Sequence, residues 1–482
     1  MYVRTGRVAG IGGVRPCAGG VGDGDALEVG VTLKGRHIVG IGDLSRAEIE
    51  LIFRCADRFL AQPRQTHLGR GFQVATLFFE PSTRTRLSFE SAMNRLGGAV
   101  LTVADGAQSS VAKGETLADT GRVVSGYADA IVLRHPVEGV ARAVADAAMV
   151  PVINAGDGAH EHPTQTLCDL YTLQRECGPL PGLTVTLYGD LKYGRTVHSL
   201  AYGLALFGAR IIFAPADPAL APPPYLIERL HAEWGIAANW WDPDGGLPLP
   251  TTDAIYLTRV QKERFTGTAG VREYPRIDHA TLRRWGASDH TLLMHPLPRA
   301  GELDPELDSE ARSAYFRQAA YGVPVRMATI ALLLGLAEEE WSSGWGGHQP
   351  SALATALPAD VPDAPINAKT GHPALDVRCA NENCICNREP ASAAPRFIFS
   401  GVRHDERGAA FLGLRCRFCE TPTRAAGAYE RATRCFRTAE DGALIELLTG
   451  TNDAELIFAN EDGALPRVAA GALPQVAALP GG

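Results

Sequence analysis

Between residues 44 and 337, short apolar runs alternate with segments in which apolar residues recur at helical spacing. The runs at residues 74–79, 99–103, 130–133 and 150–154 have the length of buried strands. The segments at 45–60, 82–97, 115–127 and 139–148 have the periodicity of helices that bury one face. Strands that alternate with helices form a parallel sheet covered on both faces, so the pattern predicts an α/β domain.

The same alternation begins again after residue 180. Strands are predicted at 184–188, 210–214, 254–257 and 292–294, and a helix is predicted at 195–207. Helical segments at 163–175 and 316–337 would join or brace the two halves. Ligands of open α/β sheets bind beyond the carboxyl ends of the strands, so two such domains facing each other would form a cleft.

The last part of the chain has a different composition. A stretch rich in Pro, Gly and Ser at about 342–373 reads as a linker, and short β-like runs follow at 397–402 and 412–415. Two cysteine pairs accompany these runs, Cys379 with Cys384 and Cys416 with Cys419. Paired thiolates on separate loops form a tetrahedral site, and so small a module lacks the core to fold without a metal. We therefore expect a structural Zn²⁺ bound by these four cysteines.

Two alternatives to that zinc site stay open. The cysteines could form a redox pair instead, and Cys386 could replace Cys384 as a ligand.

The patterns predict an α/β fold class, with two doubly wound parallel-sheet domains and a small C-terminal β-rich zinc domain. The first domain spans 36–165, and the second spans 166–336, with its last helix packing back on the first. A linker at 337–375 leads to the zinc domain at 376–435. Residues 1–35 are expected to be a disordered extension, and 436–482 a tail of uncertain order.

Charge and hydropathy narrow the possible partners. The 482 residues carry a formal net charge of −8, which gives no general attraction to nucleic acid or anionic lipid. An anionic ligand must therefore be bound by locally placed arginines. Because no apolar run approaches the roughly 18 to 20 residues of a membrane span, and the N-terminus lacks an apolar signal core, we expect a cytoplasmic protein.

A candidate phosphate site follows the strand at 74–79. The sequence there is Glu80-Pro81-Ser82-Thr83-Arg84-Thr85-Arg86-Leu87, and it opens the helix at 82–97. Ser82 can cap the helix, and the unpaired N–H groups of the first turn attract an anion together with the helix dipole. Two hydroxyls and two guanidiniums on the same turn suit a phosphate. The alternative is a well-capped helix with surface arginines.

Further polar clusters occur at or just after the predicted strand ends, among them RHP at 134–136, HPTQ at 162–165 and RVQ at 259–261. The set FFEPSTRTR, KGETLADT, RHP, HPTQ, GDLKYGRTVHSL, TRVQKER and MHPLPR resembles the catalytic chain of the aspartate carbamoyltransferase family over about 33–336. Ornithine-using relatives typically carry a cysteine-containing loop where this chain has His295-Pro296-Leu297-Pro298-Arg299.

The resemblance implies that the first domain binds carbamoyl phosphate and the second binds L-aspartate. The products would be N-carbamoyl-L-aspartate and phosphate, in an early step of de novo pyrimidine biosynthesis. It implies no covalent intermediate and no catalytic cofactor. The alternatives are a carbamoyltransferase for another amino-acid acceptor and a non-catalytic assembly scaffold that keeps the fold.

The resemblance also assigns roles to individual residues. The phosphate would be held by Ser82, Thr83, Arg84, Thr85 and Arg134. The carbonyl oxygen would accept from Arg84, Thr85 and His162, the catalytic set, and Gln165 would hold the carbamoyl amine. The two carboxylates of aspartate would contact Arg195, Arg259 and Gln261, and the main-chain carbonyls of Leu297 and Pro298 would complete the pocket.

Resemblance implies an assembly as well. Ser109 and Lys113 lie in a loop that in this family enters the neighbouring subunit's site, where Lys113 would also contact aspartate, so a homotrimer with shared sites is expected. The cysteine pairs resemble the zinc domain of the family's regulatory chain, over about 376–420. The chain would thus be a natural fusion that lacks the nucleotide-binding domain, with larger assemblies built through the zinc domain.

Overall fold

The structure is a computed structural model that describes residues 32–104, 110–259, 261, 276–337, 378–390, 392–393, 395–405 and 410–430, with short strands at 435–438, 444–446, 455–456 and 478–479. The predicted extension up to residue 31, nearly all of the predicted linker and most of the predicted tail lie outside these residues. Among the described helices, none is both long enough and apolar enough to cross a membrane.

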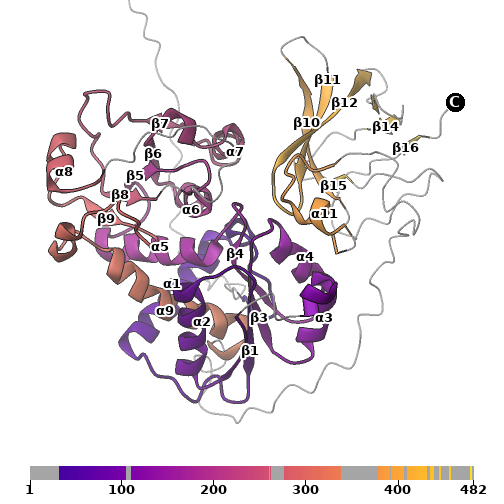
Figure 1. The fold of residues 1–482 in the computed structure, drawn as a ribbon, viewed down its shortest axis with the longest axis horizontal. Helices are drawn as coiled ribbons and strands as arrows, with labels where there is room; N and C mark the ends of the chain where they lie inside the picture. Colours follow the sequence, from indigo (N-terminus) through magenta and orange to yellow (C-terminus); the bar gives the residue numbers. More distant parts are fainter. Residues whose placement is uncertain are drawn as a thin grey trace, which may run out of the picture. The chain divides into compact units, whose positions relative to one another are not determined.

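The first domain is built on a four-stranded parallel sheet with the order β2-β1-β3-β4 (Figure 1). Its strands are β1 (Gln73–Phe78), β2 (Ala99–Val103), β3 (Ala130–His135) and β4 (Val152–Asp157), and its helices are α1 (Arg46–Ala61), α2 (Thr83–Leu96), α3 (Leu117–Ser125) and α4 (Val140–Ala147). Neighbouring residues of β1 point to opposite faces. Val74 packs in the core that contains α1 and α2, whereas Ala75 packs in the core that contains α3 and α4. Both faces of the sheet are therefore covered by helices.

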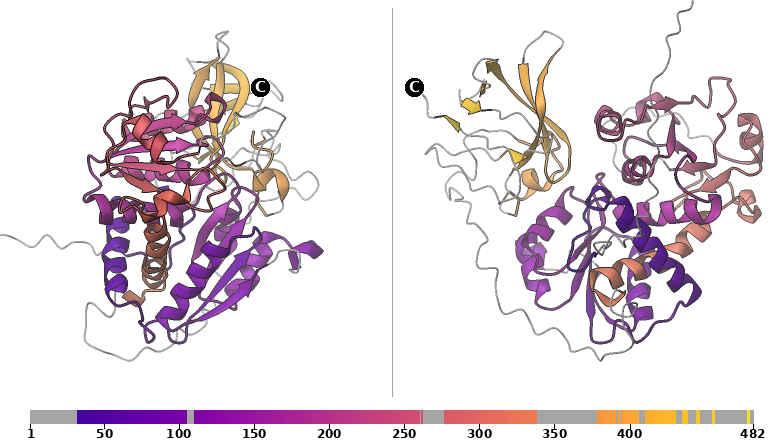
Figure 2. Two further views of the ribbon diagram at one scale, coloured as in Figure 1. Left: turned by 60° about the vertical axis from the view of Figure 1, so that its left-hand side comes forward. Right: turned by 180° about the vertical axis from the view of Figure 1, so that it is seen from behind.

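The second domain has a five-stranded parallel sheet with the order β7-β6-β5-β8-β9 (Figures 1 and 2). Its strands are β5 (Thr184–Gly189), β6 (Arg210–Pro215), β7 (Asn239–Trp240), β8 (Ala254–Leu257) and β9 (Leu292–Met294). Its helices are α6 (Arg195–Leu206), α7 (Pro224–Trp234) and α8 (His279–Trp285), while α5 (Pro163–Cys177) connects the two domains and α9 (Tyr315–Leu333) follows β9. Helix α9 follows the second sheet in sequence but packs against α1 and α2 of the first domain, and against α5.

The C-terminal part contains an antiparallel sheet with the order β15-β10-β11-β12-β13-β14-β16 and the short helix α11 (Ile385–Arg388). Its longer strands are β10 (Phe397–His404), β11 (Ala410–Cys416) and β12 (Pro422–Glu430). The shorter ones are β13 (Cys435–Thr438), β14 (Leu444–Glu446), β15 (Glu455–Leu456) and β16 (Ala478–Leu479), so the sheet continues into the predicted tail. The predicted fold class, two parallel-sheet α/β domains followed by a small β-rich part, is confirmed.

Candidate active site and cysteine cluster

A cavity of about 550 Å³ is lined by residues of both α/β domains. Twelve of the residues assigned to the substrate site lie in its wall: Ser82, Thr83, Arg84, Thr85, Arg134, His162, Gln165, Arg195, Arg259, Gln261, Leu297 and Pro298. Elements far apart in sequence thus bring the predicted phosphate-side and carboxylate-side residues together.

The turn between β1 and α2 forms one wall of the cavity. Ser82 is the N-cap residue of α2, but its side chain makes no capping hydrogen bond, so the predicted cap interaction is absent and the hydroxyl stays in the wall. Thr83, Arg84 and Thr85 occupy the first turn, whose amides attract an anion. The motif predicted that two guanidiniums face a phosphate, but Arg86 does not face the cavity. It lies outside the wall and pairs with Glu90 at 3.6 Å, one helical turn further on.

The surroundings of Arg84 disfavour the charge on its guanidinium. Although its side chain is exposed in the open cavity, partial loss of hydration lowers its pKa, and nearby Arg259 lowers it further. Two guanidiniums from different domains therefore act on the same space, which favours a bound anion between them.

His162 is held rigidly at the start of α5. It is the N-cap residue, is only 4% exposed, and donates its backbone N–H to Ser199 Oγ at 3.0 Å. Burial lowers the pKa of the ring well below 6.5, and Arg195, Arg134 and Arg326 lower it further. The imidazole is therefore neutral at physiological pH and can donate one hydrogen bond without carrying a charge.

Gln165 lies one helical turn from Asp169, which fixes its amide. Gln165 Nε2 donates to Asp169 Oδ1 at 2.7 Å, and Asp169 also accepts from Gln318 and Tyr256 at 2.6 and 2.8 Å. Burial raises the pKa of Asp169 to about 6. Because the amide nitrogen is engaged, the oxygen of Gln165 is the group left to accept from a ligand N–H.

Glu80 is a residue of the wall that sequence reasoning did not place in the site. It accepts from Arg134 Nη2 at 2.7 Å and from both terminal nitrogens of Arg195 at 3.1 and 3.2 Å. Arg134 belongs to the first domain and Arg195 begins α6 of the second. Glu80 therefore links two predicted ligand-binding arginines across the cavity. In the sequence, only its place in the motif FFEPSTRTR indicated that it belongs to the site.

The absence of a side chain at Gly156 leaves room for the guanidiniums of Arg134 and Arg195. Its φ of 116° is disfavoured for residues with a side chain, and an added Cβ would lie 2.9 Å from Arg195 Cζ and 3.1 Å from Arg134 Nη1. Only glycine allows the backbone to approach both arginines so closely.

Hydrogen bonds, most of them partly buried, also fix the wall of the second domain. Asp190 Oδ2 accepts from Gln261 N at 2.9 Å, and Arg259 Nη2 donates to Gln261 Oε1 at 3.4 Å. In the next loop, Leu297 N donates to His295 Nδ1 at 2.8 Å, and Nε2 of the same ring lies 2.8 Å from Glu302. These contacts place the Leu297 backbone at the cavity.

Two predicted site residues are not in this wall. Lys113 is exposed in the short helix η3 (Ser110–Lys113), and Ser109 lies outside the described residues. Arg326 of α9, by contrast, was not predicted but lines the cavity. It is 4% exposed, lies over the Phe89 ring and donates to Gly322 O at 3.1 Å. No nearby motif marks Arg326, because α9 is far from the other site residues in sequence.

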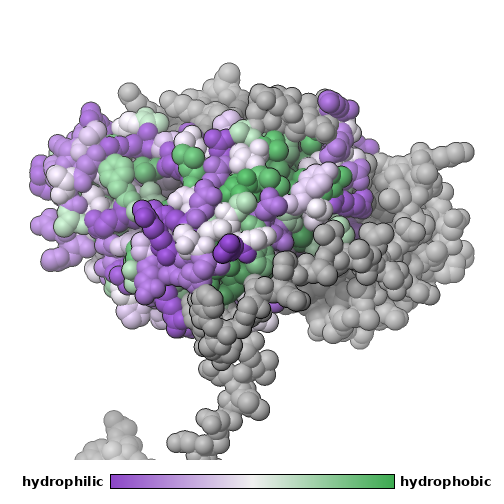
Figure 3. Space-filling model, turned by 90° about the horizontal axis from the view of Figure 1, so that it is seen from below, coloured by the Kyte–Doolittle hydropathy of each residue, from purple (hydrophilic) through white to green (hydrophobic). Residues whose placement is uncertain are grey.

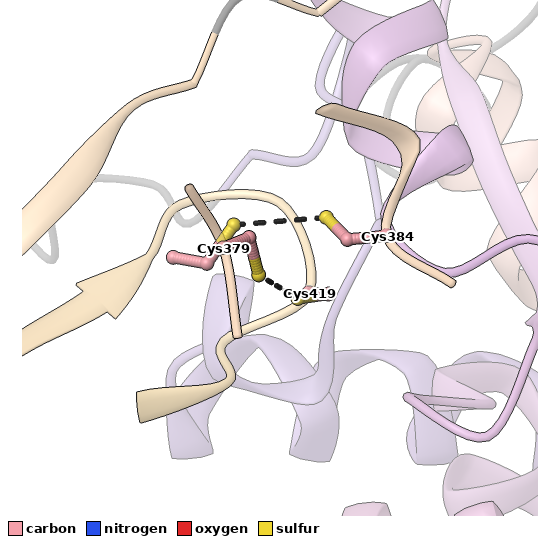
Figure 4. A group of neighbouring side chains, drawn as sticks. Cys379, Cys384 and Cys419 are labelled. Atoms are coloured by element: carbon pink, nitrogen blue, oxygen red, sulfur yellow. Dashed lines mark hydrogen bonds between the residues drawn. The ribbon is translucent and has the colours of Figure 1, made fainter. Parts of the chain in front are cut away.

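The four predicted metal-ligating cysteines form one buried group whose sulfurs lie within 4.8 Å of one another. Figure 4 shows Cys379, Cys384 and Cys419 with their sulfurs directed toward each other. The Sγ–Sγ distances are 3.4 Å for Cys379 and Cys419 and 3.7 Å for Cys384 and Cys416. A tetrahedral ion with metal–sulfur bonds of about 2.3 Å separates its ligand sulfurs by about 3.8 Å, so the group fits a metal.

The four thiols of this group form no disulfides. Hydrogen bonding to Cys384 and other members lowers the pKa of Cys379 to about 5, whereas hydrogen bonding to Cys379 raises the pKa of Cys384, so only part of the group favours the thiolate that a metal requires. Cys386 lies outside the group of four, but its sulfur is 3.3 Å from Cys384 Sγ. The alternative ligand is therefore adjacent to the residue that it would replace.

Comparisons with known proteins match the described α/β domains. The carbamoyl-phosphate-binding domain model of aspartate/ornithine carbamoyltransferases matches residues 36–175, and the Asp/Orn-binding domain model matches residues 181–333. The aspartate carbamoyltransferase catalytic subunit of Archaeoglobus fulgidus is 50% identical, over 61% of this chain and 98% of that protein. The subunit from Thermococcus onnurineus is 46% identical, over 63% and 99%.

Solved structures agree with these matches. Aspartate transcarbamoylase from Trypanosoma cruzi, in complex with carbamoyl phosphate and aspartate, is 39% identical with a TM-score of 0.57, over 63% of this chain and 98% of that one. The catalytic subunit of the M. jannaschii enzyme is 43% identical with a TM-score of 0.54, over 64% and 100%. Since nearly the whole length of each relative is covered at these identities, the chain belongs to the family of aspartate carbamoyltransferase catalytic subunits.

Proposed function

We propose that the chain transfers the carbamoyl group of carbamoyl phosphate to the amine of L-aspartate. The aspartate nitrogen forms a bond to the carbamoyl carbon and gives up a proton, the bond from that carbon to the phosphate oxygen breaks, and phosphate leaves. The observation that carries this proposal is the single cavity in which Arg84 and His162 of the first domain meet Arg259 of the second. Such a step would belong to pyrimidine biosynthesis.

Recognition of carbamoyl phosphate follows from the donors of the first domain. The first turn of α2 and Arg134 would bind the phosphate, since backbone amides and a guanidinium provide several charge-assisted hydrogen bonds. Arg84, Thr85 and neutral His162 would donate to the carbonyl oxygen as it gains negative charge. Gln165, with its amide nitrogen fixed by Asp169, would accept from the carbamoyl NH₂.

Recognition of aspartate follows from the second domain. Arg259 and Arg195 would bind the two carboxylates, and Gln261 would support Arg259. The link from Glu80 to Arg134 and Arg195 holds both arginines in the cavity. Substrate binding would therefore bring the two domains together around two anions, which orients the amine toward the carbamoyl carbon.

The acceptor decides between this function and its enzyme alternative. In an assay of purified protein with carbamoyl phosphate, we expect turnover with L-aspartate and far less with ornithine, because ornithine lacks the second carboxylate that the guanidiniums would bind. Faster turnover with ornithine would contradict the aspartate assignment. No turnover with either acceptor would favour the non-catalytic scaffold.

Arg259→Ala tests the carboxylate site directly. Removal of one guanidinium partner of a desolvated carboxylate costs on the order of 2 to 5 kcal/mol, so we expect a large increase in the aspartate concentration at half-maximal rate. Arg283→Ala, an exposed arginine of α8 in the same domain, is the matched control and should leave that concentration unchanged. An unchanged aspartate dependence in Arg259→Ala would remove this residue from the site.

We further propose that the active protein is a homotrimer with shared sites. Lys113 is exposed and lies outside the cavity wall of its own chain, which leaves it available to the site of a neighbouring chain. Figure 3 shows apolar side chains gathered within one face of the molecule, with polar ones around them. The exposed large apolar residues of the first domain include Leu101, Val123, Tyr127 and Met149, which a neighbouring chain would cover.

We also propose that Cys379, Cys384, Cys416 and Cys419 bind a structural Zn²⁺, which would hold the start of the module to the β11–β12 turn. The geometry of the thiols supports this proposal. The bound ion would supply folding energy to a module with a small core and would take no part in carbamoyl transfer.

A further inference from the structure

A second group of possible metal ligands lies next to the cysteine cluster. His160 and Glu161 belong to the loop between β4 and α5, and Glu420 follows Cys419 in the cysteine-rich module. One ligand atom from each of the three residues can be chosen so that all lie within 4.8 Å of one another. Nothing in the carbamoyl transfer proposed above uses these side chains.

The His160 ring is directed into this group and is incompletely paired. Its side chain is nine-tenths buried, and Nδ1 lies 3.1 Å from Asp157 Oδ2. Because Asp157 is a buried carboxylate that accepts, Nδ1 carries the proton. Nε2 is buried and has no hydrogen-bond partner within the described part of the chain. Burial lowers the pKa of the ring, but Asp157 and Glu420 raise it well above 6.5, so without a metal Nε2 carries a second proton that an ion would replace. A carboxylate that orients a histidine in this way is a frequent feature of metal sites.

Carboxylate oxygens face Nε2 of His160. Glu420 Oε2 lies 3.9 Å from His160 Nε2, which is too far for a hydrogen bond but suits two ligands of one ion. Glu161 is 3% exposed and is anchored through Oε2, which accepts from Ile41 N at 2.8 Å. The three ligands therefore come from two rigid segments and converge on one point.

The charges around this point nearly balance, with the carboxylates slightly in excess. Glu138, Asp157, Glu161 and Glu420 act on the group, and the charged His160 ring acts against them together with the guanidiniums of Arg229 and Arg415. Arg229 pairs with both Glu420 and Glu233, so it does not neutralise the whole set. Burial raises the pKa of Glu161 to about 7, and nearby Glu420 raises it as well. A divalent cation in place of the Nε2 proton would offset this excess.

We propose that His160, Glu161 and Glu420 bind a divalent transition-metal ion, with Asp157 orienting the histidine. One imidazole nitrogen and two carboxylate oxygens are ligands of intermediate to low softness, and this set suits Zn²⁺. It differs from the four thiolates of the cysteine cluster. The ion would join the loop that precedes His162 to the cysteine-rich module. Two metal ions of different coordination would then lie in the same chain.

Metal content of the full chain tests this proposal. After loading with Zn²⁺ and dialysis, we expect His160→Asn to hold one ion fewer per chain than the unmodified protein. Asparagine keeps an N–H near the position of Nδ1 for Asp157 but removes Nε2. Glu161→Gln should lose the same ion, while His67→Asn, a substitution of an exposed histidine in the first domain, should lose none. Equal zinc content in His160→Asn, Glu161→Gln and the unmodified chain would overturn the proposal.

Cobalt substitution shows which site changes. Co²⁺ bound by thiolates absorbs through sulfur-to-metal charge transfer, whereas Co²⁺ bound by nitrogen and oxygen does not. We expect His160→Asn to lose cobalt while its charge-transfer absorption per chain is retained. Loss of that absorption together with the ion would assign the missing metal to the cysteines and would contradict the second site. If the unmodified chain bound cobalt only with a thiolate spectrum, protons rather than a metal would balance the carboxylates, which would also overturn it.

Discussion

Arg84 and Arg86 lie two positions apart at the start of helix α2, yet only Arg84 faces the proposed ligand. Both belong to the same motif, which by itself suggested that both guanidiniums suit a phosphate, whereas the family resemblance assigned a role to Arg84 alone. The structure places Arg84 in the wall of the cavity and pairs Arg86 with Glu90 outside it. The difference follows from helical geometry, because residues two positions apart point to different sides of a helix.

Arg84→Ala should therefore abolish most of the activity while the fold is kept. Removal of one preorganised donor to a developing oxyanion lowers kcat by about 10²- to 10³-fold, and Arg84 is proposed to contact the phosphate as well. Arg86→Ala should keep most of the rate, since its guanidinium lies outside the wall. The measurement is kcat with both substrates saturating, with circular dichroism as a check on folding. Comparable losses in the two variants would argue against a special role for Arg84.

His162 makes a prediction about pH. Its folded pKa lies below the 6.5 of an unperturbed histidine, because burial and three arginines disfavour the charged ring. The unfolded chain therefore binds a proton first as the pH falls through 6.5, and this residue makes the folded state progressively less stable below that pH. Between pH 6.5 and 8 it should stay neutral.

Histidine-selective NMR of the labelled chain would check this expectation. The His162 ring signals, assigned by their absence in His162→Gln, should not shift between pH 6.5 and 8. His67, which is exposed, serves as an internal comparison in the same spectra. A midpoint for His162 within that range would mean that the ring is charged during catalysis.

At the level of helices and strands, the sequence predicts well the elements that contain an apolar run, and it misses one that lacks such a run. The strands at 99–103, 254–257 and 292–294 have the predicted ends. Helix α2 ends at Leu96, one residue before the predicted end, since φ of Gly97 is 88° and an added Cβ there would lie 1.9 Å from Thr66 O. The two-residue strand β7, however, is exposed and carries no apolar run that could reveal it.

Sequence motifs likewise predicted part of the candidate site and missed the rest. The motifs placed twelve residues that share one cavity, because each motif follows a strand or opens a helix at the same edge of its sheet. The link between Glu80 and Arg195 could not be predicted, since it joins residues 115 positions apart across two domains. The same holds for Arg326, which α9 returns to the first domain's side of the cavity.

The cysteine-rich module gives a prediction at this scale. Cys416→Ser removes one of the four converging thiols, so the module should lose its ion and unfold, because its small core depends on the metal. The carbamoyl-transfer site lies in the two α/β domains, and we therefore expect most of the aspartate-dependent rate to persist. Cys177→Ser, a half-buried cysteine outside the cluster, is the matched control. Zinc analysis, activity and solution mass would be measured on both variants.

Retention of full zinc content by Cys416→Ser would show that this cysteine is not a ligand. In the proposed assembly the module joins trimers, so the variant should also have a smaller solution mass than the unmodified chain. An unchanged large assembly would mean that trimers associate through other surfaces.

For the molecule as a whole, the question is whether one chain holds a complete active site. The described cavity contains the residues proposed for both substrates except Lys113, which is exposed outside it, and Ser109, which lies outside the described residues. Strand β2 is the edge of the first sheet, and Leu101 within it is 39% exposed. An open edge with exposed apolar side chains is a surface that another chain would cover.

Mixing two inactive variants tests the shared site. Lys113→Ala should impair every site of its own trimer, and so should His162→Ala, for a different reason. In a mixed trimer, a Lys113→Ala chain supplies an intact His162 while an adjacent His162→Ala chain supplies Lys113, so that site is complete. Random exchange at equal amounts would restore about a quarter of the sites, because two independent positions must each be filled by the right chain.

We therefore expect activity to reappear after the two proteins are dissociated together and reassembled, but not when they are mixed without exchange. If reassembled mixtures stayed inactive although mass measurement showed hybrid trimers, each site would be built from a single chain, and Lys113 would have no role across the interface.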